Sequence, residues 1–171
     1  MAKKKDEKTN VMRILDQEKI SYTAYFCKTE EDPKNIRDYG AHVAHTLGQD
    51  PARGFKTLVS RGASGGIYVF EVPVLESLDM KKAAKAVGEK SIELLPVSEI
   101  NAVTGYVRGG CSPVGMKKQY PTVFHESVLN YDTIYISGGK IGAQVELPPQ
   151  ALIDLLQAKT LDIIAKDARQ S

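Results

Sequence analysis

The sequence is organised around one glycine-rich stretch, Thr104-Gly105-Tyr106-Val107-Arg108-Gly109-Gly110-Cys111-Ser112-Pro113-Val114-Gly115-Met116-Lys117-Lys118. The stretch contains four glycines, one proline and three cationic side chains. Glycine adopts backbone conformations that other residues resist, and it lets a ligand approach the main chain closely. A loop of this composition can direct backbone N–H groups at an anionic oxygen. The stretch is therefore either a long turn with solvated basic flanks or a binding site for a carboxyl-derived or phosphate-bearing ligand.

The segments around this stretch predict an α+β fold. Strands are expected where apolar residues dominate or alternate, as in Phe55 to Val59, Ile67 to Val74 and Ala143 to Leu147. Helices are expected where apolar residues share one face between capping residues. They are predicted after Thr9 or Asn10, from Arg37 to Leu47 before Gly48, from Met80 to Val87 between Asp79 and Gly88, and from Pro149 onward. Because strands outnumber helices, we expect a mixed, largely antiparallel sheet with flanking helices, its core closed by Leu161, Ile163 and Ile164.

Length and composition predict one domain. The 171 residues are enough for a hydrophobic core, and 42% of them are hydrophobic. We expect a single domain over residues 1–171, with the polar residues 1–8 as a disordered lead. The net charge of +2 excludes a bulk nucleic-acid coat, and no apolar run is long enough to span a bilayer. Two cysteines give no disulfide framework, so a cytoplasmic location is expected.

Lys56 is the most informative single residue. It lies inside an apolar predicted strand, where a lysine is uncommon unless its amine reaches solvent or a partner. One interpretation is a lysine that extends its amine into solvent. The other is a cation that lines a cleft and holds a carbonyl, phosphate or ribose oxygen.

No residue pattern predicts a protein nucleophile, a metal or a nucleotide site. Cys111 would need a base within hydrogen-bond reach, and no spacing supplies a histidine as that base, so a filler cysteine is favoured. His42 and His45 can share a helix face but have no clear third ligand, so no metal is expected. The glycine-rich stretches match neither the phosphate-loop nor the dinucleotide pattern. An ATPase or a dehydrogenase is therefore disfavoured, and no cofactor is predicted.

Three segments together resemble the YbaK/EbsC family. They are Phe55-Lys56-Thr57-Leu58-Val59, Gly105 to Lys118, and Ile134-Tyr135-Ile136-Ser137-Gly138-Gly139-Lys140-Ile141-Gly142. The resemblance covers about residues 11–165, nearly the whole chain. It implies a free-standing aminoacyl-tRNA editing domain whose α+β sheet is curled towards a barrel. It also implies deacylation of mischarged tRNA, which in the best-known members removes cysteine from proline tRNA and in some from cysteine tRNA.

The same resemblance implies the residues of the site. The catalytic residues would be Lys56, Gly109 and Gly110, and we expect N–H groups of the two glycines to hold the carbonyl oxygen as it becomes an oxyanion. The substrate-binding residues would be Thr57, Ser112, Pro113, Gly138 and Gly139. Two family features do not carry over, because a tyrosine would fall near Cys27 and an aspartate would fall on Gln144. These departures concern the fine substrate specificity.

A mechanism and partners are implied as well. In cysteine-specific members the substrate's own thiol attacks its carbonyl and leaves as a cyclic thiolactone, a lyase-type step; hydrolysis is the other route. The expected partners are the 3′ end of aminoacyl-tRNA and, as a candidate, a prolyl-tRNA synthetase, with no DNA and no membrane. Two other functions stay open: editing of alanine or serine with water as attacker, and a tRNA- or synthetase-binding module without activity. The lysines that are either tRNA phosphate contacts or a solvated surface are Lys81, Lys82, Lys85, Lys117 and Lys118.

Overall fold

The computed structural model describes residues 8–27 and 39–166 of the chain. The lead predicted over residues 1–8 falls outside these ranges apart from Lys8, whose amine forms an ion pair with Asp16. The predicted helix start at Arg37 also falls outside them. None of the described helices has the length and the apolar character that a bilayer span requires.

The described part of the chain contains five α-helices and eight strands. The helices are α2 (Asn10–Gln17), α3 (Tyr39–Leu47), α4 (Met80–Val87), α5 (Val97–Thr104) and α6 (Pro149–Leu156), with two short 3-10 helices, η2 (Pro51–Arg53) and η3 (Glu126–Asn130). The strands are β1 (Thr23–Phe26), β2 (Phe55–Gly62), β3 (Ile67–Pro73), β4 (Ile92–Leu94), β5 (Thr122–His125), β6 (Ile134–Ser137), β7 (Ala143–Leu147) and β8 (Lys159–Leu161). The predicted α+β class is confirmed.

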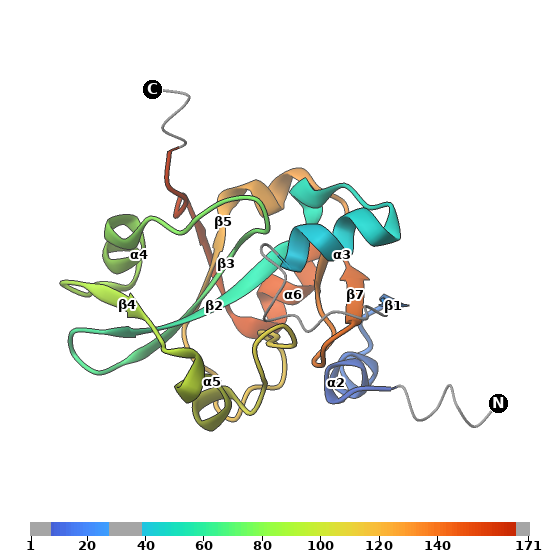
Figure 1. The fold of residues 1–171 in the computed structure, drawn as a ribbon, viewed down its shortest axis with the longest axis horizontal. Helices are drawn as coiled ribbons and strands as arrows, with labels where there is room; N and C mark the ends of the chain where they lie inside the picture. Colours follow the sequence, from blue (N-terminus) through green and yellow to red (C-terminus); the bar gives the residue numbers. More distant parts are fainter. Residues whose placement is uncertain (1–7, 28–38, 167–171) are drawn as a thin grey trace.

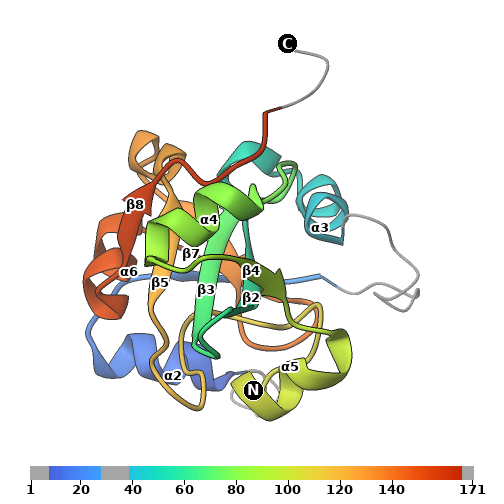
Figure 2. The same cartoon turned by 90° about the vertical axis from the view of Figure 1, so that its left-hand side faces the viewer.

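The strands form two sheets, with the helices arranged around them (Figures 1 and 2). The three-stranded sheet has the order β1-β7-β6, and the five-stranded sheet has the order β4-β2-β3-β5-β8. Four of the six strand pairs are antiparallel, while β3–β5 and β5–β8 are parallel. An isolated bridge between Gly54, just before β2, and Tyr135 of β6 links the two sheets. The pairing is thus mixed and largely antiparallel, as predicted, and the described strands do not close into a barrel.

Two hydrophobic clusters stabilise this arrangement. The larger one is shared by both sheets with α2 and α6, and it includes Leu15, Phe124 and Leu147. The smaller one joins α4 to the five-stranded sheet through Phe70, Val72, Ala83, Ala84, Ile92, Val123 and Ile163. The neighbours Val123 and Phe124 belong to different clusters because successive side chains of a strand point to opposite faces. Phe55 belongs to the larger cluster, so the start of β2 is held where the two sheets meet.

Helix ends follow the predicted capping. The side chains of Thr9 and Asp79 accept hydrogen bonds from N–H groups three residues further on, at 3.2 and 2.9 Å. Gly48 and Gly88 follow α3 and α4 with φ of 69° and 74°. This left-handed conformation favours glycine over residues with a Cβ, which explains why both helices stop there.

The end of the chain departs from the prediction at one strand. Leu161 was expected to close the core, but it belongs to β8 and is 41% exposed. Ile163 is fully buried, and Ile164 packs against the smaller cluster as expected. The short β8 pairs in parallel with β5. Three residues are too few to show the alternation that identifies a strand from sequence.

Candidate active site

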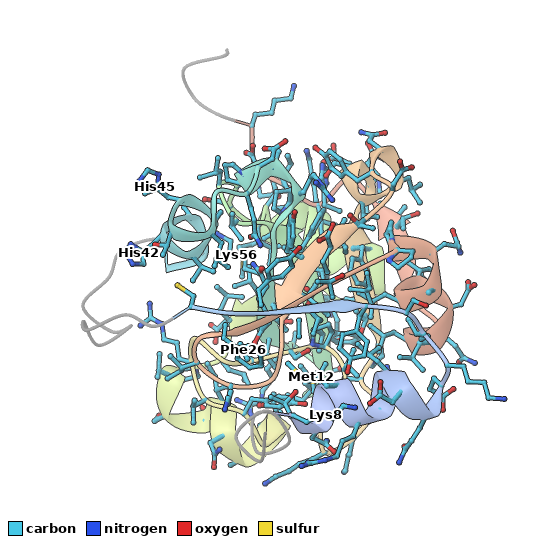
Figure 3. The ribbon with its side chains drawn as sticks, turned by 90° about the vertical axis from the view of Figure 1, so that its right-hand side faces the viewer. Lys8, Met12, Phe26, His42, His45 and Lys56 are labelled. Carbon is cyan, nitrogen blue, oxygen red and sulfur yellow. The ribbon has the colours of Figure 1, made fainter. Side chains whose placement is uncertain are left out.

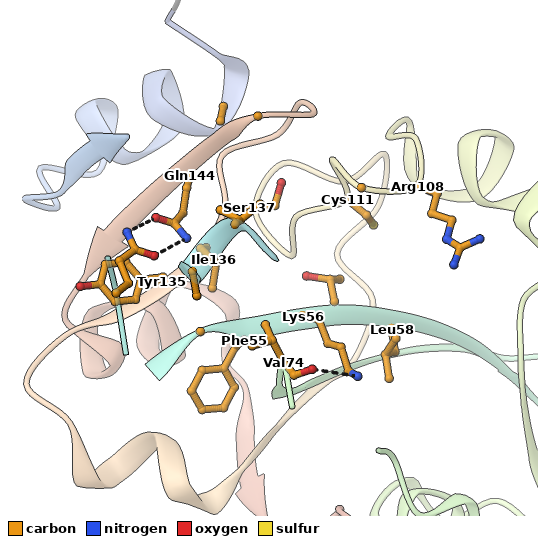
Figure 4. Close-up of a pocket in the computed structure, with 18 residues that line it drawn as sticks. Phe55, Lys56, Leu58, Val74, Arg108, Cys111, Tyr135, Ile136, Ser137 and Gln144 are labelled. Atoms are coloured by element: carbon orange, nitrogen blue, oxygen red, sulfur yellow. Dashed lines mark hydrogen bonds between the residues drawn. The ribbon is translucent and has the colours of Figure 1, made fainter. Parts of the chain in front are cut away.

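A pocket of about 340 Å³ opens at the start of β2, where the two sheets meet (Figure 4). Its walls come from the end of α3 and the residues after it, the start of β2, the residue after β3, the glycine-rich stretch, and the β6–β7 hairpin. The lining residues are Val43, Ala44, Gln49, Gly54, Phe55, Lys56, Thr57, Leu58, Val74, Arg108, Gly109, Cys111, Tyr135, Ile136, Ser137, Gly142, Ala143 and Gln144. The volume lies at the lower end of the range for small-ligand sites.

Lys56 lines this pocket from β2, so it is a cation at a cleft rather than only a solvent-directed lysine (Figure 4). Its Nζ donates a hydrogen bond to the Val74 carbonyl at 3.4 Å. β4 pairs with β2 only over residues 60–62, so β4 does not cover the start of β2. The exposed Arg108 is the second cation of the lining, and no carboxylate lines it in the described part of the chain. The pocket therefore suits a phosphate or a developing negative charge.

The two adjacent glycines of the loop have different surroundings. Gly109 lines the pocket, and its N–H donates to no acceptor among the described residues. The Gly110 N–H instead donates to the Val107 carbonyl at 2.9 Å, and Gly110 does not line the pocket. A Cβ on Gly110 would lie 2.9 Å from the backbone of residues 140–141, so glycine allows the loop to pack against the β6–β7 turn. The expectation that both N–H groups face the substrate is corrected: that of Gly110 is engaged inside the loop.

Thr57 lines the pocket, whereas Ser112 and Pro113 do not. Both are buried, and the Ser112 hydroxyl accepts a hydrogen bond from the Val114 N–H at 3.3 Å. These two residues shape the loop and do not contribute surface to the pocket.

Gly138 and Gly139 have a similar supporting position in the β6–β7 turn. The Gly138 N–H donates to the Ala143 carbonyl at 2.8 Å, and the Gly139 N–H donates to the Ser137 hydroxyl at 3.2 Å. Gly139 has φ of 99°, a conformation that favours glycine. The turn places their neighbour Ser137 in the lining, although the sequence had pointed to the glycines.

Two glutamines that the sequence did not connect form part of the pocket wall. Gln49 Nε2 donates to Gln144 Oε1 at 2.6 Å, and Gln144 Nε2 donates to Gln49 Oε1 at 3.0 Å (Figure 4). The pair links the segment after α3 to β7, across 95 residues of sequence. Gln144 was singled out only as a departure from the family pattern, and no local pattern points to Gln49.

A polar cluster fixes the position of the lining residue Tyr135. Glu146 accepts hydrogen bonds from the Tyr25 hydroxyl at 2.7 Å and from Arg53 Nη2 at 3.0 Å. It also accepts one from the Thr133 hydroxyl. The Arg53 guanidinium lies 4.9 Å from the centre of the Tyr135 ring. Burial alone would raise the pKa of Glu146, but the hydrogen bonds from Thr133, Tyr25 and Arg53 outweigh it and lower that pKa.

Glu71 on β3 lies directly opposite Thr57 on β2 and was not singled out from the sequence. It is fully buried, and neither carboxyl oxygen has a hydrogen-bond partner among the described residues; the Thr57 hydroxyl is equally without one. Burial raises the pKa of Glu71 well above its usual range, and the nearby Thr57 hydroxyl opposes the rise without completing a regular hydrogen bond. An unsatisfied buried polar group costs about 1–3 kcal/mol, so stability does not explain this glutamate. The sequence does contain a signal for Glu71, because a charged residue within an apolar strand is unusual. The same kind of signal identified Lys56.

Cys111 lines the pocket without the surroundings of a nucleophile. Burial, with a smaller contribution from Glu71, raises the pKa of its thiol to about 12. The reactive form of cysteine is the thiolate, which is scarce at neutral pH when the pKa is this high. No histidine, aspartate or glutamate lines the pocket within the described ranges. The interpretation of Cys111 as a filler residue agrees with these surroundings.

The lysines on α4 lie apart from the pocket. α4 packs on the five-stranded sheet, at the end of the molecule away from α3 in Figure 1. Lys81 and Lys85 are exposed. The Lys82 amine is engaged, since it pairs with Asp162 at 2.9 Å and donates to the Ile164 carbonyl at 2.9 Å.

Lys117 and Lys118 are exposed at the end of the glycine-rich stretch. The Lys117 amine donates to the Ala102 carbonyl at 3.1 Å, which holds it close to α5. The five predicted tRNA contacts therefore belong to two separate elements, and none of them lines the pocket.

The histidines form no metal site in the described part of the chain. His42 and His45 project outward from α3, away from Lys56 (Figure 3). His125 is buried, and its Nδ1 accepts a hydrogen bond from the Ile163 N–H at 3.3 Å. Within the described ranges, no group of three or more histidine, cysteine, aspartate or glutamate side chains is placed to hold a metal.

Comparison with known proteins connects this chain to tRNA editing. Residues 33–155 match the aminoacyl-tRNA editing domain family. EbsC of Enterococcus faecalis, whose name proposes a Cys-tRNA(Pro)/Cys-tRNA(Cys) deacylase, is 44% identical over 168 residues, covering 98% of this chain and 100% of that protein. YwhH of Bacillus subtilis is 26% identical over 125 residues, covering 73% of this chain and 79% of that protein.

Two solved structures share the fold. The protein APE2540 has a TM-score of 0.81 at 22% identity, covering 92% of this chain and all of that one. A proposed trans-editing enzyme for prolyl tRNA synthetase has a TM-score of 0.76 at 24% identity, covering 91% of this chain and 97% of that one. The similarity to these two structures shows a shared fold. The family match and the 44% identity are similarities of sequence over most of the chain. This chain belongs to the aminoacyl-tRNA editing domain family.

Proposed function

We propose that this chain deacylates mischarged tRNA in the cytoplasm, with cysteine on proline tRNA as the main substrate and cysteine on cysteine tRNA as a second one. Membership of the editing family supports the reaction class. The 44% identity with EbsC supports the choice of cysteine, because that protein's name proposes these two substrates. The pocket supports a small aminoacyl group, since its volume is about 340 Å³.

The main support for the proposed mechanism comes from the chemical groups that line the pocket in the described part of the chain. They include two cations, the N–H of Gly109, and a cysteine whose thiol pKa is about 12. These groups can position an ester and stabilise negative charge, but none of them is an activated nucleophile. A substrate that brings its own nucleophile matches this lining.

The proposed reaction is an intramolecular attack. The sulfur of the substrate cysteine attacks its own ester carbonyl carbon, and the bond from that carbon to the ribose oxygen breaks. The thiol proton ends on the ribose oxygen. The products are a cyclic thiolactone and tRNA with a free terminal ribose. The protein's contribution is orientation of the thiol and stabilisation of the oxyanion, for which no protein nucleophile is needed.

Four lining residues have a role in this proposal. The Gly109 N–H donates to the carbonyl oxygen as it becomes an oxyanion. Lys56 and Arg108 hold the ribose or the terminal phosphate by their charge, and Thr57 contacts the substrate. A hydrogen-bond donor to an oxyanion is typically worth ~100- to 1000-fold in rate.

The tRNA body is proposed to contact the exposed amines of Lys81, Lys85, Lys117 and Lys118. Lys82 is a weaker candidate because it is paired with Asp162. Each phosphate that a lysine neutralises releases counterions, so the logarithm of the binding constant should fall as the logarithm of salt concentration rises. The double variant Lys81→Ala/Lys85→Ala should flatten this slope by about 0.7–0.9 for each phosphate that is no longer neutralised. An unchanged slope would remove α4 from the tRNA surface.

The decisive experiment is deacylation of a panel of tRNAs. Proline tRNA is charged with cysteine, alanine, serine or proline, and cysteine tRNA with cysteine. We expect rapid release only from the two cysteinyl tRNAs, with thiolactone detected by mass spectrometry. Cys111→Ala should keep this activity, because the attacking sulfur belongs to the substrate.

Other outcomes assign other functions. Release of alanine or serine would show that water is the attacker and would replace the thiolactone mechanism. Binding of tRNA without any deacylation would make the chain a binding module. A prolyl-tRNA synthetase is the proposed partner, because it produces the mischarged tRNA; co-elution of the two proteins with Cys-tRNA(Pro) checks this.

A further inference from the structure

Glu71 is a buried carboxyl group to which the proposed reaction gives no role. Its side chain is 0% exposed, and none of the ion pairs in the described part of the chain includes it. A carboxyl group in such a place keeps its proton, because the charged form is strongly disfavoured away from water and without a cation. Glu71 is therefore a neutral carboxylic acid that has one O–H to donate.

Thr57 is placed to accept that hydrogen bond. The two residues are direct partners in the β2–β3 ladder, so their side chains emerge on the same face of the sheet. Opposite residues have Cβ atoms about 4.5–5.5 Å apart, a separation that a glutamate and a threonine side chain can span. Thr57 Oγ1 is buried without a partner in the described chain, as are both Glu71 oxygens. Thr57 also lines the pocket and Glu71 does not, so Thr57 is the residue through which Glu71 can act on the pocket.

We propose that Glu71 is a positioning residue for the pocket: as a ligand binds, its carboxylic O–H donates to the buried Thr57 Oγ1, and the Thr57 side chain turns its own hydroxyl proton towards an acceptor oxygen of the ligand. A hydroxyl has a single proton, so an incoming hydrogen bond on its oxygen leaves that proton for another acceptor. The ligand class is the aminoacylated terminal adenosine of tRNA, which offers an ester carbonyl oxygen and ribose oxygens. The inference rests on the proposed function and names a further residue for the same site.

A purely structural role for Glu71 has a different consequence. Replacing a buried, unsatisfied carboxyl with an apolar side chain of similar volume removes the cost of burying it. Glu71→Met should therefore raise the melting temperature. If Glu71 only filled space, activity would be unchanged in this variant. Under our proposal the same variant is more stable and less active, a combination that loss of structure cannot produce.

The test measures kcat/KM for Cys-tRNA(Pro) and the melting temperature in four variants: Glu71→Met, Glu71→Gln, Thr57→Val and the double variant Glu71→Met/Thr57→Val. We expect Glu71→Met to lower kcat/KM about 5- to 10-fold, the size of one hydrogen bond. The double variant should be no worse than Thr57→Val alone, because Glu71 acts through Thr57. Glu71→Gln should keep near wild-type activity, because its amide N–H replaces the acid O–H as donor.

Ser60→Ala is the matched control. Ser60 lies on β2, the strand of Thr57. It is fully buried, and its hydroxyl donates a hydrogen bond to the Tyr68 carbonyl at 3.0 Å. Its loss should lower the melting temperature and leave kcat/KM unchanged. Full activity in Glu71→Met, additive effects of Glu71→Met and Thr57→Val, or a Glu71→Gln variant as impaired as Glu71→Met would each overturn the proposal.

A binding measurement separates this proposal from the proposed function. The probe is adenosine that carries cysteine through an amide at its 3′ position, which resists deacylation. If the wild type binds the probe but deacylates nothing, and Glu71→Met alone weakens binding, the positioning role stands and the deacylase fails. If the wild type deacylates Cys-tRNA(Pro) and Glu71→Met matches it in both assays, the positioning role alone fails. No binding and no deacylation by the wild type would overturn both.

Discussion

The side-chain amides of Gln49 and Gln144 hydrogen-bond to each other in both directions, at 2.6 and 3.0 Å, and both residues line the pocket. The pair fastens the segment after α3 to β7 without adding charge. Each amide keeps one N–H and one lone pair beyond those used in the pair. The wall is therefore both held in place and still able to contact a ligand.

Removal of Gln49 should weaken substrate binding more than it slows the chemical step. Gln49→Ala leaves Gln144 without its partner, and a hydrogen bond of this kind is worth about 0.5–1.5 kcal/mol. We expect KM to rise about 2- to 10-fold with little change in kcat, measured by steady-state deacylation. The double variant Gln49→Ala/Gln144→Ala should be no worse than Gln144→Ala. A fall in kcat at constant KM would contradict a binding role for the pair.

Removal of Lys56 should have a much larger effect on the rate. Lys56→Ala deletes a cation from the lining, so we expect single-turnover deacylation of Cys-tRNA(Pro) to slow by ~100- to 1000-fold. Lys90→Ala, an exposed lysine between α4 and β4, is the control for a change of net charge. Equal rates for Lys56→Ala and the wild type would show that Lys56 takes no part in the reaction.

Gly110→Ala should damage the loop by steric overlap rather than by removal of a donor. The new Cβ would lie 2.9 Å from the backbone of residues 140–141, which is too close without displacement of the loop or the turn. Such overpacking typically costs about 1–3 kcal/mol, measurable by urea unfolding, and activity should fall with it. Cys111→Ala is the neighbouring control and should retain activity. Wild-type stability in Gly110→Ala would show that the two segments are not in close contact in solution.

The Glu146 cluster should give stability that depends on pH. The lowered pKa of Glu146 means that the folded state favours its carboxylate, so its contribution is present above the unfolded pKa of about 4.3. The contribution is lost as pH falls through the lower folded pKa. Glu146→Gln should therefore be less stable than wild type by about 1–3 kcal/mol at pH 7, with the difference shrinking below about pH 4. Thermal unfolding at several pH values measures this, and a difference that does not vary with pH would contradict it.

The fold was predictable where the signal is local. α4 spans Met80–Val87 as predicted, because Asp79 caps one end and Gly88 terminates the other. β7 likewise has the predicted bounds Ala143–Leu147. β8 escaped prediction because it is three residues long and depends on pairing with β5. Which strands pair in parallel is likewise decided by tertiary contacts that no local pattern records.

The site was predictable where a residue is unusual in its own segment. Lys56 in an apolar strand and Gly109 in a dense glycine loop both line the pocket. Gln49 is ordinary in its own segment, and its importance appears only through Gln144, 95 residues away. Gly110 was predicted as a site residue but does not line the pocket. The sequence alone does not distinguish a glycine that donates its N–H to a ligand from one that allows two backbone segments to pack closely.

The pairing of β1 with β7 has a consequence for synthesis of the protein. The Tyr25 hydroxyl of β1 donates a hydrogen bond to Glu146 of β7, which follows 121 residues later in the sequence. β7 also supplies lining residues of the pocket. A chain still emerging from the ribosome already contains Lys56 and the glycine-rich stretch, but not the strand that closes the wall. Contacts this distant in sequence form only after the long loop between them has been closed. A stalled or truncated translation product that ends before β7 therefore lacks a complete pocket and, under the proposed function, cannot act on aminoacyl-tRNA.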